Sequence, residues 1–232
     1  TNLFMPAVLK LPNWETQDRL TREWIQGKTE IPEIKDLWPS GPVASVQING
    51  PEEVKSGEEV SLMVLVKNRK AGHNLTTGPL DFMRLWIHLV VEDAKGNTIA
   101  EWGNIDPETR SINDVPGQIH EIGNARDEGT LVLEGLPLDG EGNPLLEHEL
   151  WKKAGGRGQR VIFPRYTDKQ TYRFQVPPST EGPITVTADL NFRRYRQEFL
   201  ELVLPTLEEE SGVYQPTVTK NSVSREIPVV VN

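Results

Sequence analysis

From Ala44 onward, apolar side chains recur at every second position in several separate runs. The pattern is clearest in two of them, Val60, Leu62, Val64, Val66 and Leu85, Ile87, Leu89, Val91. Successive side chains of a β-strand point to opposite faces, so this alternation predicts strands with one face in a core. The 18 Pro and 19 Gly residues are scattered along the chain and disfavour long helices. We therefore expect a mainly β structure.

Further short strands are predicted over 46–48, 98–102, 130–133, 160–163 and 226–231. Trp86 and Val90 make the second face of the 85–91 strand partly apolar, which indicates a central strand. The alternating runs 172–176 and 184–190 flank a Pro-Pro-Ser-Thr-Glu-Gly connection and predict a hairpin. About eight or nine short strands with turns between them favour an all-β fold, an immunoglobulin-like antiparallel sandwich.

The first 43 residues follow a different pattern. Leu20 and Trp24 lie four residues apart within 14–26, and Gly27 follows, which predicts one amphipathic helix. We expect an N-terminal helical arm over 1–43 and a β-sandwich domain over 44–232. The first residue is Thr1 rather than Met, so the chain is expected to be processed or part of something longer.

Composition excludes several classes of protein. The absence of Cys excludes disulfides, thiolate metal sites and covalent haem attachment within these residues. Acidic residues outnumber basic ones by 34 to 25, for a net charge of −9, which argues against nucleic-acid binding. No run of about 18 apolar residues is present, so no membrane span is expected.

No sequence order typical of a catalytic triad, a phosphate-binding loop or a zinc protease is present, so no catalytic residue and no enzyme activity are predicted. Glu147, His148 and Glu149 are adjacent and point in different directions, which favours a solvated acidic segment over a metal site. The Gly-rich turn around Asp139 lacks the distal Glu of a calcium loop and reads as a hairpin tip. No metal site is predicted.

Three segments remain as candidates for function. His73 lies between Gly72 and Gly78 in the loop joining the two strongest strands, as a potential ligand or acid–base group, or as a structural His bonded to loop carbonyls. The Arg-rich run 193–196 either pairs with Glu198 and Glu201 or grips carboxylates, such as propionates or a partner's acidic patch. Residues 104–159 lack a regular pattern, which is typical of a functional excursion or docking surface.

Several of these pieces resemble a known family. The match includes Asn68, Ala71-Gly-His73, Thr77-Gly78, Arg84-Leu-Trp86 and Asp93-Ala-Lys-Gly96, followed in order by pieces at 146–152, 160–164, 172–177 and 190–199. Together they resemble the cysteine-free β domain that follows the haem region of multihaem c-type cytochromes of the doubled C-x-x-C-H kind. Residues 1–6 are similar to the end of the preceding haem-bearing segment. Thr76 stands where the family commonly has Pro, so the His73 loop is expected to be less rigid.

The resemblance implies a non-catalytic scaffold or docking domain of a periplasmic or extracellular electron-transfer protein. Haem c would be held by an upstream segment or a partner, since this chain has no Cys to attach it. The arm over 1–43 would continue the haem-bearing region, and His73 would be a haem ligand or face a haem.

A cell-surface β-sandwich module that binds carbohydrate or protein is the alternative. It would act through exposed aromatic side chains, for which Trp102, Trp151 and Tyr214 are the candidates.

Overall fold

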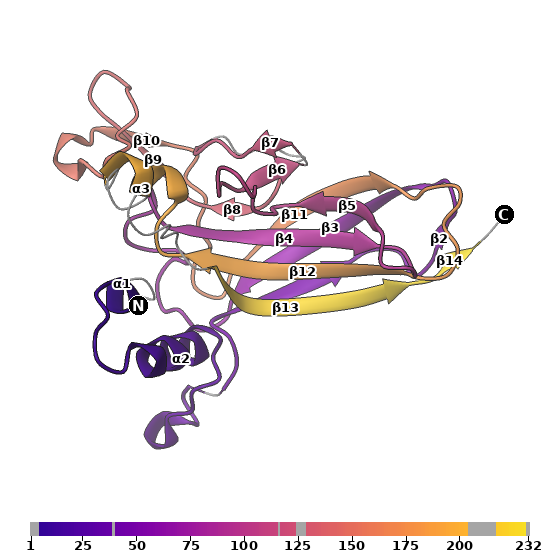
Figure 1. The fold of residues 1–232 in the computed structure, drawn as a ribbon, viewed down its shortest axis with the longest axis horizontal. Coiled ribbons are helices and arrows are strands. Elements are labelled where there is room, and N and C mark those ends of the chain that lie inside the picture. The colour runs from indigo at the N-terminus through magenta and orange to yellow at the C-terminus, as the bar shows by residue number, and fades with distance from the viewer. Residues whose placement is uncertain (1–4, 39, 116, 124–128, 204–216, 231–232) are drawn as a thin grey trace.

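Long antiparallel strands form the body of the molecule (Figure 1). The structure is a computed structural model that describes residues 1–232 except 1–4, 39, 116, 124–128, 204–216 and 231–232. The main strands are β1 (Ala44–Asn49), β3 (Glu59–Asn68), β4 (Arg84–Glu92), β5 (Thr98–Trp102), β11 (Thr167–Gln175), β12 (Ile184–Arg193) and β13 (Val218–Ile227).

These strands form two sheets. One has the order β1-β3-β11, and the other has the order β13-β12-β4-β5, with the short β8 (Val132–Leu133) also pairing with β4. All of these pairs are antiparallel. Buried side chains of both sheets, among them Leu62, Val64, Leu89 and Leu190, belong to one hydrophobic core. The all-β antiparallel sandwich and the N-terminal helix are therefore confirmed.

The structure also contains shorter strands and helices. The short strands are β2 (Val54–Lys55), β6 (Asn113–Val115), β7 (Gln118–Ile119), β9 (Leu136–Leu138), β10 (Gly155–Arg157) and β14 (Val229–Val230). The helices are α1 (Met5–Val8), α2 (Trp14–Ile25) and α3 (Gln197–Val203), with 3₁₀ turns at Pro32–Ile34 and Leu150–Lys152. None of the helices in the described part of the chain combines the length and apolar composition needed to cross a bilayer.

The first half of strand β4 is buried on both faces. Leu85, Ile87 and Leu89 contribute to the core between the sheets, whereas Trp86 packs on the opposite face with Ile112 and other residues of the 104–135 segment. The Trp86 indole Nε1 donates to the carbonyl oxygen of Gly103 at 2.8 Å. Figure 1 shows β6, β7 and β8 beside β4 and β5. The irregular segment therefore covers the outer face of the central strand.

The predicted hairpin between 172–176 and 184–190 is wrong. Strand β11 pairs with β3, whereas β12 pairs with β4 and β13, so the Pro-rich connection crosses from one sheet to the other. Alternation reveals that a strand exists but does not select its partner. Residues 160–163 are likewise no strand: Ile162 makes an isolated bridge with Leu75, and Arg160 exchanges backbone hydrogen bonds with Glu134. Strand β13 was missed over most of its length because polar residues fill it.

The arm is attached to the sandwich at the end of α2. Ile25 is buried in the core, and Gln26 Nε2 donates to the carbonyl oxygen of Thr219 on β13 at 3.3 Å. Gly27 has a φ of 71°, and a Cβ there would lie 2.0 Å from the Gly41 carbonyl oxygen. Only glycine allows this close approach, in which Gly41 N donates to the Gly27 oxygen. The division into domains 1–43 and 44–232 stays a prediction.

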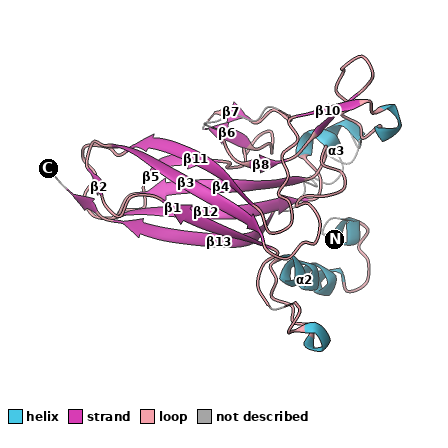
Figure 2. Ribbon diagram, turned by 180° about the vertical axis from the view of Figure 1, so that it is seen from behind, coloured by secondary structure: helices cyan, strands magenta, loops and turns pink. Residues whose placement is uncertain are grey.

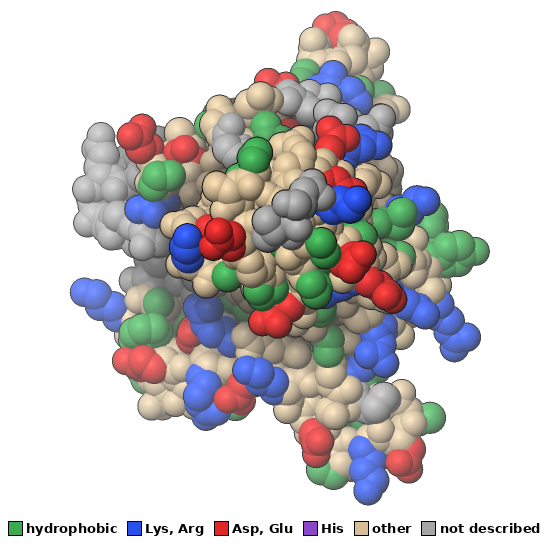
Figure 3. Space-filling view, turned by 90° about the vertical axis from the view of Figure 1, so that its right-hand side faces the viewer, with side chains coloured by type: hydrophobic (Ala, Val, Ile, Leu, Met, Phe, Trp, Pro, Cys, Tyr) green, Lys and Arg blue, Asp and Glu red, His purple; other side chains and the backbone are tan. Residues whose placement is uncertain are grey.

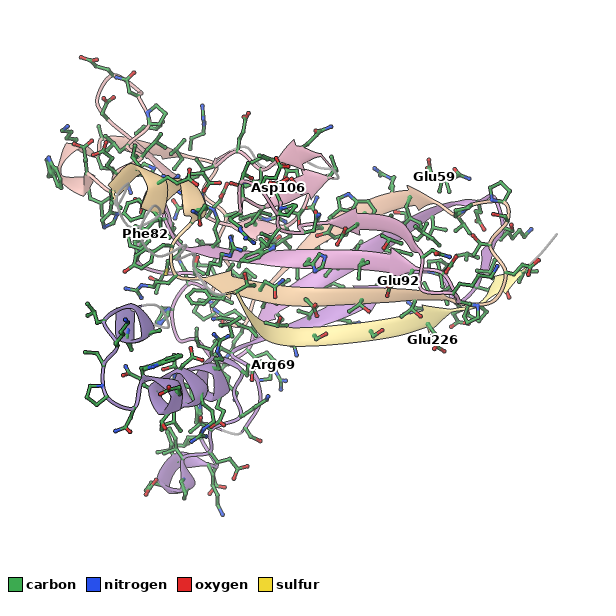
Figure 4. All side chains as sticks on the ribbon, viewed as in Figure 1. Glu59, Arg69, Phe82, Glu92, Asp106 and Glu226 are labelled. Atoms are coloured by element: carbon green, nitrogen blue, oxygen red, sulfur yellow. The ribbon has the colours of Figure 1, made fainter. Side chains whose placement is uncertain are left out.

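Figures 1 and 2 agree that the helices gather at one end of the sandwich, together with β9 and β10. In Figure 4, Arg69 and Phe82 lie toward this end, whereas Glu59, Glu92 and Glu226 lie toward the other. The loop from β3 to β4, which contains His73, therefore belongs to the helical end. The space-filling view in Figure 3 faces the opposite end, where acidic and basic side chains are interspersed.

A buried tyrosine links the two sheets. Tyr172 of β11 is 1% exposed, and its hydroxyl oxygen accepts a hydrogen bond from the Leu131 backbone N–H, next to β8, at 3.2 Å. The ring of Trp102 from β5 packs edge-on against it, with centroids 5.2 Å apart. Burial raises the pKa of Tyr172 to about 12, so the hydroxyl remains protonated at physiological pH.

Replacing Tyr172 by Phe should lower the free energy of unfolding by about 1–3 kcal/mol, because the buried Leu131 N–H loses its acceptor. Urea denaturation measures this change. Tyr166→Phe is the matched control, since Tyr166 is 69% exposed, and it should change stability by less than about 0.5 kcal/mol. Equal effects of the two substitutions would contradict a specific role for the Tyr172 hydroxyl.

Candidate functional site

Asn68, the last residue of β3, organises the His73 loop. Its side chain is buried, and Nδ2 donates to the carbonyl oxygens of His73 at 3.0 Å and of Ile162 at 3.1 Å. Its Oδ1 accepts from the Ala71 N–H at 3.0 Å. One amide thus joins the His73 loop to a segment more than 90 positions away.

Backbone hydrogen bonds complete this junction. Leu75 N donates to the Ile162 oxygen at 2.8 Å, and Ile162 N donates back to the Leu75 oxygen. Leu75 and Thr76 are both buried. The loop is therefore anchored immediately beside Thr76, although the expectation about its rigidity stays a prediction.

The His73 side chain is exposed to solvent. Its Nδ1 lies 3.0 Å from the Asn74 carbonyl oxygen. A carbonyl oxygen can only accept, so this contact places a proton on Nδ1, and in the neutral imidazole the Nε2 lone pair is then available. That tautomer suits a ligand to a metal or an acceptor of a partner's hydrogen bond. No finding tests the assignment of His73 as a haem ligand, which stays a prediction.

The segment around Ile162, to which the His73 loop is hydrogen-bonded, carries exposed aromatic and basic side chains. Phe163 and Tyr166 are 56% and 69% exposed, and their rings make an edge contact at 6.1 Å. Arg69 and Arg165 are exposed as well. We call His73, Phe163, Tyr166, Arg69 and Arg165 the His73 surface. It combines exposed aromatic area with positive charge on a chain of net charge −9.

A second constellation is buried beneath the excursion. His120 lies between two carboxylates, with Nδ1 2.7 Å from Asp114 and Nε2 2.9 Å from Glu134. Arg84 Nε is 3.6 Å from the other Glu134 oxygen. All four side chains are 6% exposed or less. Sequence reasoning missed this cluster because its members share no recognisable spacing, although it did single out the excursion that contains three of them.

The cluster is ionic. Burial by itself would lower the pKa of His120, but the hydrogen bonds and negative charges of Asp114 and Glu134 outweigh it and raise the pKa to about 9. Burial would raise the pKa of Glu134, but His120 and Arg84 hold it below its usual value. The imidazolium is therefore the neutral-pH form, and its two N–H groups are both donated to carboxylates.

The other polar candidates have structural partners. His148 Nδ1 lies 2.8 Å from Asp81, whereas Glu149 pairs with Lys152 at 2.6 Å, so this segment does not converge on one point. Asp139 accepts hydrogen bonds from the backbone N–H groups of Glu141 and Asn143, as a hairpin tip does. No group of side chains able to hold a metal ion is found within the described residues.

One expectation about exposed aromatic side chains is wrong. Trp102 is 6% exposed, because it packs on Tyr172, so it is no binding aromatic. Trp151 is 79% exposed, and Tyr214 lies outside the described residues. Arg193 and Arg196 are buried and donate mainly to backbone carbonyls, and Arg196 NH1 also lies 3.9 Å from Glu198, one of the two carboxylates predicted to pair with this run.

Comparison with known proteins identifies a related fold. No protein-family model and no curated protein match the chain. It is similar to a penta-haem cytochrome c552 from Thermochromatium tepidum, with 15% identity and a TM-score of 0.51. The match covers 80% of this chain but only 39% of the cytochrome. At this identity the likeness shows the fold alone.

Two other solved structures are more distant. A CARDB domain from Pyrococcus furiosus, in complex with di-metal ions, has 13% identity and a TM-score of 0.34, with 81% of this chain and 87% of that chain covered. Spo0M, a sporulation control protein from Bacillus subtilis, has 13% identity and a TM-score of 0.29, with 81% and 49% covered. These TM-scores are too low to establish a shared fold.

The raised pKa of His120 predicts a stability that depends on pH. Its pKa in the folded protein, about 9, lies above the ordinary histidine value of 6.5, so its contribution to stability is complete below about pH 6.5 and is lost as the pH rises through 9. At pH 7, His120→Gln should cost about 3–5 kcal/mol, because the buried carboxylates lose their cation. The difference in free energy of unfolding between the wild-type protein and His120→Gln should narrow above pH 9.

Urea denaturation of both proteins from pH 6 to pH 10 measures this gap. Taking the difference between them removes the opposing effect of Lys220, whose pKa is lowered to about 8 by burial. His88→Gln is the control, since His88 is only partly buried and contacts the single carboxylate of Glu101. A gap that does not change with pH would show that His120 is not charged in the folded protein.

Proposed function

We propose that this chain is a non-catalytic scaffold and docking domain of an envelope multihaem c-type cytochrome, in the periplasm or outside the cell. The observation that carries the proposal is the overlap of its fold with the penta-haem cytochrome over 80% of the chain. The chain spans 39% of that cytochrome, which leaves room in such a protein for a separate haem-bearing part.

The positions of the family-like motifs support the same function. The pieces at 68–78 and 160–164 are far apart in the sequence, yet the Asn68 side chain and the Leu75–Ile162 bridge join them. The pieces at 84–86 and 190–199 meet through the pairing of β4 with β12. Motifs that resemble the family in sequence order therefore also lie together in space.

The His73 surface is the proposed contact with the haem-bearing partner. Exposed aromatic side chains and Arg are the residue types that anchor protein interfaces. The arm adds apolar area at the same end of the molecule, where Leu20 and Trp24 are 50% and 45% exposed. Burying such groups against a partner is favourable by roughly 1.5–3 kcal/mol for each large side chain.

The described residues could contact a haem but could not attach it covalently. The chain has no Cys for covalent attachment, so haem c would be held by a preceding segment or a partner. His73 offers Nε2 as an axial ligand or as an acceptor near the haem edge. The haem would supply electron transfer, and this chain would orient it and exclude water.

The proposal assigns no catalysis to the chain. In the part of the chain that the structure describes, His88, His120 and His148 each contact carboxylates, and the His73 ring contacts a backbone carbonyl. None of these contacts joins a His to a Ser or Thr hydroxyl, as activation of a hydroxyl nucleophile by His requires.

A surface module that binds carbohydrate or protein is the second candidate, and the exposure of Trp151 favours it. Solvent-exposed Trp is typical of binding surfaces. Of the two candidate aromatic residues that the structure describes, Trp102 is buried, so the cytochrome proposal is preferred.

Replacing His73 by Ala in the intact haem-loaded protein should shift the reduction potential or the low-spin spectrum of one haem. Axial ligands and the groups hydrogen-bonded to them tune haem iron directly, so the effect should be confined to the haem that faces His73. Potentiometric titration and electron paramagnetic resonance measure it.

His88→Ala is the matched control, because His88 lies within β4 and contacts Glu101. It should leave every haem signal unchanged. If His73→Ala also leaves them unchanged and lowers only thermal stability, His73 is structural. A complete gene product that binds no haem at all, and binds a glycan or protein through Trp151, would instead establish the second candidate.

A further inference from the structure

A small polar pocket lies where α3 follows β12, and it shares no lining residue with the His73 surface. It is lined by Arg84, Arg110, Ser111, Ile112, His120, Arg193, Arg196, Gln197 and Glu198. Its volume is about 10 Å³, which is room for one water-sized body or a small ion. Four arginine residues therefore line a space that holds a single small particle.

The buried arginines are positioned mainly by neutral groups. Arg193 donates from Nε to the Thr217 hydroxyl at 2.9 Å and from NH1 to the Arg110 carbonyl oxygen. Arg196 donates to the carbonyl oxygens of Asp81 and Leu146, both at 2.9 Å. Carbonyl and hydroxyl groups orient a guanidinium but leave its charge uncompensated.

Arg84 is positioned in the same way. It donates to the Met83 carbonyl oxygen at 2.9 Å, and like Arg193 and Arg196 it is 5% exposed. The three buried guanidinium groups therefore donate chiefly to neutral acceptors.

Carboxylates compensate this charge only in part. Glu198, on the pocket wall, accepts from the Ser111 hydroxyl at 2.6 Å and is 3.9 Å from Arg196 NH1. Glu134, behind the pocket, is 3.6 Å from Arg84 but is also engaged by His120. Among the described residues, no carboxylate lies within 4.0 Å of Arg193.

The arginines also act on one another. Burial lowers the pKa of Arg193 to about 10, with a smaller contribution from Arg110 and against the opposing effect of Glu198. Burial likewise lowers the pKa of Arg196, with Arg84 as the next contributor. An anion between these groups would relieve both the desolvation and the mutual repulsion.

We propose that this pocket binds one halide-sized anion, chloride under physiological conditions. The guanidinium groups offer charged N–H donors, which are the stronger partners for an anion. The volume admits a single small ion and is too small for a tetrahedral oxyanion. The site is independent of the proposed cytochrome role, because it is built from residues of this chain alone.

Line broadening of ³⁵Cl nuclear magnetic resonance on titrating the 232-residue chain tests the proposal. The wild-type protein should broaden the signal saturably, and bromide should compete. Arg193→Gln removes one cation of the lining, and losing a charged hydrogen bond should raise the Kd by about tenfold or more. Glu198→Gln removes the wall carboxylate and should lower the Kd.

Arg225→Gln is the matched control. Arg225 lies on β13 and also donates to backbone carbonyls, those of Gly50 and Pro51, but it does not line the pocket. It should leave the Kd unchanged. If Arg193→Gln does not fold, the opposite shift in Glu198→Gln still decides the question, and an anomalous bromide peak among the four arginines gives a second readout. Absence of saturable broadening, equal Kd values in wild type and Glu198→Gln, or saturable binding of acetate but not halide would overturn the proposal.

Discussion

The first half of strand β4 is buried on both faces, and much of the remaining structure follows from that constraint. Its inner face joins the sandwich core, while its outer face carries Trp86, which needs both apolar cover and an acceptor for its indole N–H. The segment after β5 supplies both, and in folding back it brings Asp114, His120 and Glu134 beside Arg84. The segment that covers the apolar outer face of β4 thus also buries ionisable groups.

Those ionisable groups are stable only as a set. A single buried charge is costly, whereas alternating carboxylate and cation, each with hydrogen-bond partners, offsets the cost of desolvation. His120 is the centre of the set because both of its nitrogens donate to carboxylates. On the α3 side, Arg193 and Arg196 extend the positive charge into the pocket for which we propose an anion.

The helical end of the molecule works on a different principle. There the buried Asn68 amide holds the His73 loop and the 162–166 segment together, so exposed groups stand on a frame of backbone hydrogen bonds. A platform of this kind suits docking, because little ordering entropy remains to be lost on binding. The proposed function uses the exposed end, and the proposed anion site uses the interior beside it.

The sequence by itself determined the strands with clean alternation, the helix at 14–25 and the all-β class, because period-2 and period-3.6 patterns are local properties of the chain. Only the tertiary structure decided that β11 and β12 lie in different sheets, that the polar β13 is an edge strand, and that Trp102 is buried. It also decided the Asn68 junction, the His120 cluster and the arginine pocket. Each of these depends on contacts between residues distant in sequence, which form when sheets pair and pack, and which no local spacing encodes.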